Sequence, residues 1–124
     1  MTQRIGCGID VVELPRLRTA LSRNGQAFLR RVFTSREVAY ANARPRTRLL
    51  HLAGRFAAKE AVLKAVSCLA PNATLAMRDI EIRNDRHGRP HVIVHRKGFS
   101  RMTIHISLSH VSSVAVASAM AIRR

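Results

Sequence analysis

The chain has 124 residues, of which 47% are apolar, and this suits a single domain over residues 1–124 with a real hydrophobic core. It lacks the roughly 18 consecutive apolar residues of a membrane span, and we expect neither a membrane association nor a secretion signal. Its 22 Lys and Arg against 7 Asp and Glu give a net charge of +15, which favours an anionic partner without choosing nucleic acid, membrane, acidic protein or phosphorylated small molecule. The two cysteines lack metal-type spacing, so we expect reduced thiols in a cytoplasmic protein.

The first segment, residues 5–12, alternates like a β-strand and divides into two faces, with Ile5, Cys7, Ile9 and Val11 on one and Gly6, Gly8, Asp10 and Val12 on the other. Asp10 therefore stands in an apolar strand with two glycines on its own face. Burying an ionised Asp costs several kcal/mol unless a positive group meets it. The alternative is an Asp at a strand end that reaches solvent or caps the next helix. The glycines leave room beside Asp10 or serve close packing.

Two helices are expected next. The first spans residues 13–25, with Pro15 near its first turn and Gly25 as its C-terminal stop. The second begins with a capping box formed by Thr34 and Glu37, which gives Glu37 a structural role.

A long third helix is expected over residues 47–69. Its apolar residues form two nearly opposite stripes, a pattern typical of a central, buried helix. Glu60 projects from one of these stripes, and Lys64 follows one turn later on almost the same face. An i,i+4 ion pair, stabilising by only a few tenths of a kcal/mol, is the simple interpretation of this pair.

The C-terminal half is expected to form four strands. Residues 79–83 and 91–95 indicate a β-hairpin around a polar turn, with an outward, solvated face of Asp79, Glu81 and Arg83. Residues 103–110 and 114–122 indicate two more strands, the first facing the core with Ile104, Ile106 and Leu108. The whole order predicts an α+β single domain with a long central helix packed on a mostly antiparallel sheet.

Two carboxylates remain as candidates for chemistry. Six histidines invite a zinc interpretation, but His91 and His95 share a strand face roughly 13 Å apart, too far to ligate one ion. The chain has no glycine-rich phosphate loop. Asp10 and Glu60 together could share one divalent cation, which takes oxygen ligands and often binds substrate phosphates as well. Lys64 would add positive charge for an anionic phosphate.

Four motifs carry a family resemblance: GIDVVEL at 8–14, LAGRFAAKEAVLKAV at 52–66, DIEIRNDRHGRPHV at 79–92 and IHISLSH at 104–110. From about residue 5 to residue 120, the chain resembles the holo-acyl-carrier-protein synthases, the small single-domain 4′-phosphopantetheinyl transferases. The resemblance implies Mg²⁺-dependent transfer of the phosphopantetheine arm of coenzyme A to a serine of apo acyl carrier protein, with release of adenosine 3′,5′-bisphosphate.

The resemblance also implies roles for the candidate residues. Asp10 and Glu60 match the family's magnesium ligands, and Lys64 matches its phosphate-contacting lysine; these three are the expected catalytic residues. The general base is either Glu60 or a water held by Asp10 and the metal.

The coenzyme and the partner subunits follow from the same resemblance. Arg55 and His110 are expected close to coenzyme A. The enzyme is expected to be a homotrimer with active sites between subunits, in which adenosine and the 3′-phosphate are held by a neighbour's turn of His87, Gly88, Arg89 and Pro90. Taken alone, that turn has a structural interpretation.

By the same resemblance, the first helix is expected to dock an acidic carrier protein, of fatty-acid or polyketide synthesis, through Arg16, Arg18 and Arg23. The alternative is a solvated basic face. The chain departs from the family at residues 67–77, where a glycine-containing turn is usual. A basic nucleic-acid-binding domain of ribosomal-protein type is the competing function. The chain lacks an aromatic stacking platform, so nucleic-acid binding is expected to be only incidental.

Overall fold

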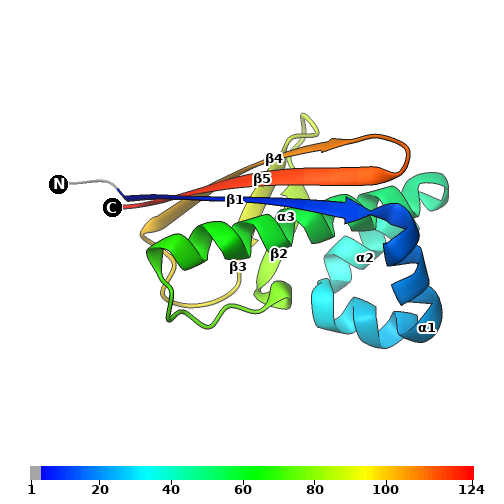
Figure 1. Ribbon diagram of the computed structural model, residues 1–124, viewed down its shortest axis with the longest axis horizontal. Coiled ribbons are helices and arrows are strands. Elements are labelled where there is room, and N and C mark those ends of the chain that lie inside the picture. Colours follow the sequence, from blue (N-terminus) through cyan, green and yellow to red (C-terminus); the bar gives the residue numbers. More distant parts are fainter. Residues whose placement is uncertain (1–3) are drawn as a thin grey trace.

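The computed structural model describes residues 4–124 (Figure 1). The chain begins with β1 (Arg4–Glu13), followed by the helices α1 (Leu14–Val32), α2 (Ser35–Asn42) and α3 (Arg48–Leu69). The strands β2 (Ile80–Asn84), β3 (Pro90–Val94), β4 (Met102–His110) and β5 (Val114–Arg123) follow, with 3-10 turns at Pro45–Thr47 and Met77–Asp79. This element order is the predicted one. Among the described residues, no helix is both long and apolar enough to cross a membrane.

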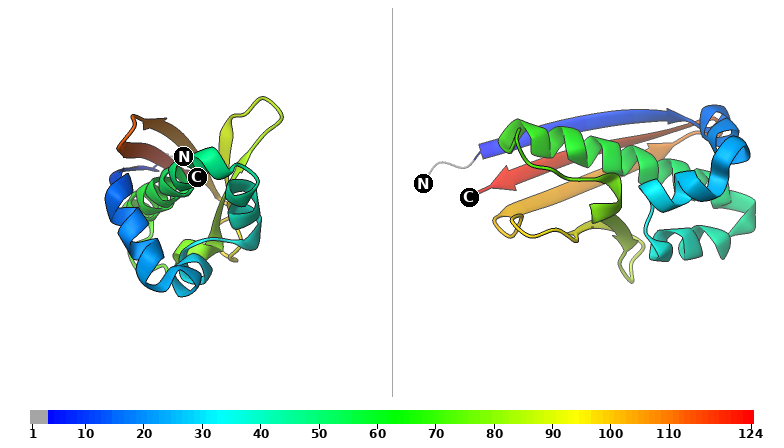
Figure 2. Two further views of the ribbon diagram at one scale, coloured as in Figure 1. Left: turned by 90° about the vertical axis from the view of Figure 1, so that its right-hand side faces the viewer. Right: turned by 90° about the horizontal axis from the view of Figure 1, so that it is seen from below.

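All the strand pairs of the described chain are antiparallel, but they form two sheets. One sheet has the order β1-β5-β4, and the other is the predicted hairpin of β2 and β3. Viewed end-on in Figure 2, α3 lies among the large sheet, the hairpin and the two shorter helices. The predicted α+β domain with a long helix packed on an antiparallel sheet is confirmed, with the sheet divided in two.

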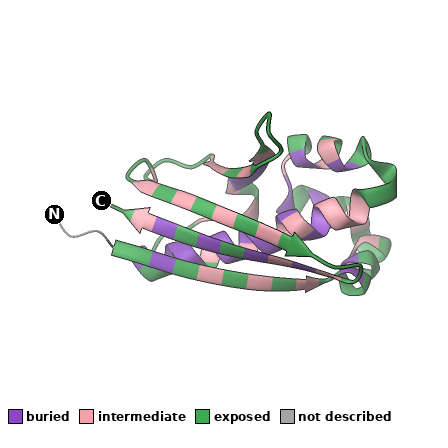
Figure 3. Ribbon diagram, turned by 90° about the horizontal axis from the view of Figure 1, so that it is seen from above, coloured by how far each residue is buried: buried purple, intermediate pink, exposed green. Residues whose placement is uncertain are grey.

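The core depends on small side chains. Four alanines of α3 and three of β5 are almost fully buried against each other: Ala57, Ala58, Ala61, Ala65, Ala117, Ala119 and Ala121. Alanine loses no side-chain rotamer freedom on burial, and its small volume lets helix and sheet approach closely. Partly buried Ile104, Ile106 and Leu108 of β4 pack against the same cluster, as expected. Figure 3 shows the resulting alternation of buried and exposed residues along β5.

The first helix is interrupted at Asn24, whose backbone is not helical, one residue before the predicted stop at Gly25. A second helical segment, which was not predicted, follows the kink and extends α1 to Val32. Gly25 does not adopt the positive φ of a helix-ending glycine; among the described residues only Gly88 and Gly98 do. Beyond the kink, Leu29 and Val32 are buried, and this packing maintains the helix.

Glu81 also corrects a prediction, because it is buried rather than solvated. Its exposed fraction is 4%, since β2 lies between α3 and α2 and both of its faces are covered. Burial raises the pKa of Glu81, but hydrogen bonds with Arg83 and His95 outweigh that effect and lower the pKa below its ordinary value. Arg36 of α2 lies 3.8 Å from the same carboxylate. Of the outward face predicted for this strand, Glu81 is buried beneath partly exposed cationic partners, whereas Asp79 and Arg83 remain partly exposed.

A buried ion pair joins α2 to α3. Nζ of Lys59 lies 2.5 Å from Oε1 of Glu37, and both side chains are fully buried. Lys59 also donates to the carbonyl of Val32 (2.7 Å), and Glu37 accepts from the backbone N–H of Ile82 (2.8 Å). Thr34 and Glu37 form the predicted capping box as well. The structural role assigned to Glu37 is confirmed, and its pair with Lys59 connects α1, α2, α3 and β2.

We expect Lys59→Met to destabilise the fold strongly, because it leaves the buried Glu37 carboxylate without its cation. Removing one partner of a buried ion pair costs about 3–5 kcal/mol. Urea unfolding of the variant measures this loss. Lys97→Met, at an exposed position, is the matched control and should change stability by less than about 0.5 kcal/mol. A loss below about 1 kcal/mol for Lys59→Met would contradict the importance of the pair.

Candidate active site

Strand β1 lies directly against α3 because Gly6 and Gly8 have no side chains. A Cβ atom at Gly8 would lie 2.1 Å from the backbone oxygen of Ala61, and one at Gly6 would lie 2.2 Å from that of Ala65. Both distances are far shorter than any real Cβ contact, so only glycine fits. Of the two interpretations of these glycines, close packing is the correct one.

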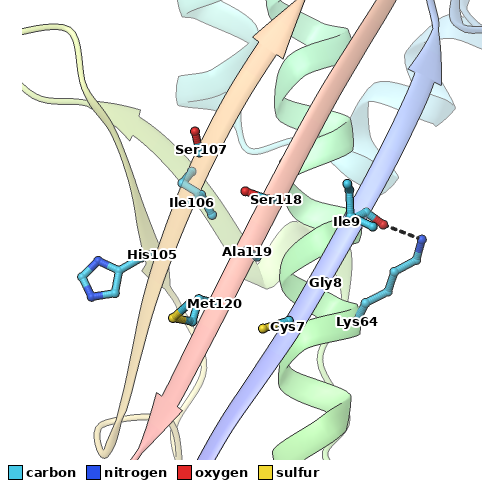
Figure 4. A pocket seen from close by; sticks show the side chains of 10 residues that line it. All are labelled: Cys7, Gly8, Ile9, Lys64, His105, Ile106, Ser107, Ser118, Ala119 and Met120. Carbon is cyan, nitrogen blue, oxygen red and sulfur yellow. Dashed lines mark hydrogen bonds between the residues drawn. The ribbon is translucent and has the colours of Figure 1, made fainter.

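This close approach brings Asp10 to α3. Nζ of Lys64 donates to the carbonyl of Ile9 (2.9 Å) and lies 3.3 Å from Oδ1 of Asp10. Figure 4 shows Lys64 reaching from the helix to β1. Asp10 is therefore neither a cap nor free in solvent, because its side chain is 20% exposed and faces a cation.

Glu60 lines the same hollow as Asp10, between β1, α1 and α3, together with Arg16, Phe28 and Phe56. Burial raises the pKa of Glu60, the negative charge of Asp10 raises it further, and Lys64 opposes the shift. All seven carboxylates lie in the part of the chain that the structure describes. Within that part, Glu60 alone has neither a hydrogen bond nor an ion pair.

The predicted i,i+4 pair is thus absent from residues 4–124, since Lys64 pairs with Asp10 instead of Glu60. Asp10 and Glu60 repel each other, and Glu60 has no protein partner in the part of the chain described. Their carboxylate oxygens are the type of ligand that a divalent cation such as Mg²⁺ prefers. No cluster of three or more His, Cys, Asp or Glu occurs in these residues. A Mg²⁺ ion fits such a pair, because it needs only one or two carboxylates and completes its shell with water and phosphate oxygens.

A second hollow, of about 500 Å³, lies between α3, the hairpin and β4. Its lining includes the predicted coenzyme residues Arg55, Gly88, Arg89 and Pro90. Arg55 is only 5% exposed, and its buried Nε has no hydrogen-bond partner. Burial lowers the pKa of His51, also in the lining, and nearby Arg55 lowers it further. The lining of the hollow is basic and includes no acidic residue.

The other predicted residues lie around these two hollows. His87 is exposed in the hairpin turn, where its backbone N–H donates to Asp85. His110 lines a separate hollow with Arg18 at the β4–β5 end. The arginines Arg16, Arg18 and Arg23 are all exposed along α1.

Tyr40, Arg44 and His51 have no role predicted from the sequence. Arg44 lies over one face of the Tyr40 ring, and His51 contacts the ring edge-on beside the second hollow. The rarity of aromatic residues was an available signal, since Tyr40 is the single tyrosine of the chain.

The two hollows face different sides of the molecule. The carboxylate hollow adjoins β1 and the basic hollow adjoins β4, and these strands are the opposite edges of the three-stranded sheet. Two strand spacings, about 10 Å, separate the edges. The hollows have no lining residue in common.

Comparison with known proteins identifies the family of the chain. The profile of the 4′-phosphopantetheinyl transferase superfamily matches residues 6–119, and the chain belongs to that family. A holo-acyl-carrier-protein synthase of Geobacillus kaustophilus is 44% identical over 114 residues, covering 91% of this chain and 84% of the relative.

Solved structures agree with the sequence relatives. The "Chronobacterium ammoniagenes ACPS-CoA complex" superposes with a TM-score of 0.84 at 30% identity, covering 98% of each chain. A holo-acyl-carrier-protein synthase of Bacillus anthracis, in complex with CoA (3′,5′-ADP), gives 0.80 at 34% identity and covers 99% of this chain and 100% of that one.

These findings confirm the expected activity. The chain is an enzyme that transfers the phosphopantetheine of coenzyme A to apo acyl carrier protein. The net charge alone left a nucleic-acid-binding domain open, and family membership favours the transferase instead.

We expect Gly8→Ala to lower both stability and turnover, because the new methyl group pushes β1 away from the backbone of α3. Overpacking of this kind costs about 1–3 kcal/mol, and the shift also separates Asp10 from Lys64. Urea unfolding and a carrier-protein assay measure the two effects. Gly25→Ala is the control, since its Cβ would meet nothing within 4 Å. Equal behaviour of the two variants would contradict the packing argument.

Proposed function

We propose that the transferase is Mg²⁺-dependent and that Asp10 and Glu60 hold the ion. The proposal rests on the hollow that these two carboxylates share, on the mutual effect of their charges and on the unpaired state of Glu60. When bound, Mg²⁺ would neutralise charge on the pyrophosphate oxygens of coenzyme A.

In the proposed reaction, a serine hydroxyl of the carrier protein attacks the phosphorus next to pantetheine. The bond from that phosphorus to the bridging oxygen breaks, and adenosine 3′,5′-bisphosphate leaves with the bond's electron pair. Little covalent chemistry falls to the protein in phosphoryl transfer, so positioning and charge neutralisation dominate. Lys64, whose Nζ reaches from α3 to β1, contacts a phosphate oxygen of coenzyme A. Glu60 accepts the serine proton, directly or through a water beside Asp10.

We further propose that Arg55 and the turn of His87, Gly88, Arg89 and Pro90 hold the adenosine and 3′-phosphate end of the coenzyme. The basic lining of their hollow, which includes no acidic residue, and the unbonded Nε of Arg55 support this role. His110, at the neighbouring end of β4, contributes from the adjacent hollow.

A homotrimer with active sites between subunits would join the two hollows. One chain presents them at opposite edges of its sheet, and a second copy could bring its β4 edge to the β1 edge of the first. The outer face of the sheet carries exposed apolar side chains, namely Ile5 (57% exposed), Ile9 (61%), Val11 (58%) and Met120 (43%). Exposed apolar patches of this kind mark protein–protein interfaces.

The partner that supplies the serine is an acidic acyl carrier protein, and we propose that α1 docks it. Arg16, Arg18 and Arg23 are exposed on this helix, and Arg16 also borders the carboxylate hollow. A net charge of +15 would steer an acidic protein toward this surface and make the association sensitive to salt. A cytoplasmic location agrees with the two free cysteines.

We expect Asp10→Asn and Glu60→Gln each to lower turnover by at least about 100-fold, because each removes charge that holds the ion. Mass spectrometry of the carrier protein, with coenzyme A and Mg²⁺, detects the gain of one phosphopantetheine. Glu13→Gln is the control, since it removes an exposed carboxylate from the same hollow. Mg²⁺ should raise the Tm of the unmodified enzyme but not of the Asp10 and Glu60 variants. Full turnover in both variants, or turnover that withstands a chelator, would refute the metal assignment.

We expect Ile9→Glu to convert the trimer to a monomer, because it places a charge in the centre of the apolar face. Sedimentation equilibrium measures the mass. Val111→Glu is the matched control, since Val111 is also exposed (64%) but lies in the β4–β5 turn away from that face. If the unmodified protein sediments as a monomer, or if Ile9→Glu stays trimeric, this face is not the interface.

A further inference from the structure

Arg55 presents an energetic problem. Its side chain is 5% exposed, yet no carboxylate oxygen of the described residues lies within 4.0 Å of it, and its Nε is unbonded. A buried cation without a counter-charge is strongly unfavourable unless another group stabilises it.

The group that contacts the Arg55 guanidinium directly is the ring of Tyr40, and the charge of Glu37 favours the protonated form from farther away. The guanidinium carbon of Arg55 lies 4.2 Å from the ring centroid, and that of Arg44 lies 3.6 Å from the same centroid. One face of a single ring has no room for two planar groups at these distances, so the two guanidinium groups cover opposite faces. Attraction between the cations and the ring quadrupole replaces part of the lost hydration.

The ring itself is fixed from two sides. Nδ2 of Asn84, at the end of β2, donates to the Tyr40 hydroxyl (2.8 Å). Arg44 donates from Nη1 to the Tyr40 carbonyl (3.0 Å), and His51 of α3 contacts the ring edge-on with 5.2 Å between centroids. The plane of the ring is therefore tied both to the hairpin and to the long helix.

We propose that Tyr40 is a positioning residue that holds the Arg55 guanidinium toward the hollow it shares with Arg89, ready for the 3′-phosphate of coenzyme A. This inference rests on the proposed role of Arg55. The planar fork of an arginine matches a phosphate group, and stacking on a fixed ring reduces the freedom lost on binding. The ligand group that this hollow would take is a ribose phosphate monoester, and Tyr40 acts on it only through Arg55.

Binding of two nucleotides tests this inference without turnover. Isothermal titration calorimetry compares adenosine 3′,5′-bisphosphate with adenosine 5′-monophosphate, which lacks the 3′-phosphate. Tyr40→Leu removes the ring and should weaken binding of the bisphosphate about tenfold, with less than a twofold effect on the monophosphate. Tyr40→Phe keeps the ring and should preserve the preference for the bisphosphate. Tyr40→Met is a second variant without a ring and should behave like Tyr40→Leu.

A double-mutant cycle separates positioning from a general structural effect. Arg55→Ala should weaken the bisphosphate selectively, and adding Tyr40→Leu to it should cost nothing further, because residues that act as a unit are not additive. Arg30→Ala, an exposed charge change on α1, is the control and should leave both affinities unchanged.

The outcomes distinguish the two proposals. Unchanged bisphosphate affinity in Arg55→Ala overturns the proposed coenzyme contact. Suppose that Arg55→Ala selectively weakens binding of the bisphosphate. If the Tyr40 variants without a ring then weaken binding of both nucleotides equally, or leave both affinities unchanged, the role of Tyr40 alone is overturned. Additive effects in the double variant also overturn it.

Discussion

The contact of β1 with the backbone of α3 at Gly6 and Gly8 is the constraint on which the rest of the structure depends. It removes the layer of side chains that normally separates a strand from a helix. Two residues after Gly8, Asp10 is carried to the helix at the level of Lys64, and Glu60 lies one turn earlier. Groups about 50 residues apart in the chain therefore meet at one hollow.

The few carboxylates of this basic protein divide between fold and site. Glu37 and Glu81 are buried and paired with cations, and they link α2, α3 and the hairpin. Asp85 accepts hydrogen bonds from backbone N–H groups and shapes the hairpin turn. Glu60 is the exception, because its charge has no protein partner and its pKa is raised by burial and by Asp10. A charged side chain that the protein itself does not stabilise is a candidate for stabilisation by a ligand.

The basic hollow has the complementary property. Arg55 is buried without an anion, and its stacking on Tyr40 stabilises it only in part. Among the described residues Glu60, which has no cation partner, and Arg55, which has no carboxylate within 4.0 Å, lie beside opposite edges of one sheet. A metal-bound coenzyme reaching from one hollow of a chain to the other hollow of its neighbour would satisfy both. In the proposed trimer, the apolar side chains exposed on the sheet face would be buried between subunits.

The order of elements, the helix cap at Thr34 and the hairpin could all be predicted from the sequence, because hydrophobic periodicity and turn residues are local properties. Asp10 and Glu60 could also be identified from the sequence, since a carboxylate within an apolar strand or helix stripe stands out from the local pattern. Only the tertiary structure decided that a second helical segment follows the break at Asn24 and that Glu81 is buried, because both depend on which element covers them. It also decided the purpose of the two glycines and the partner of Lys64, since these are distances between segments that no local pattern encodes.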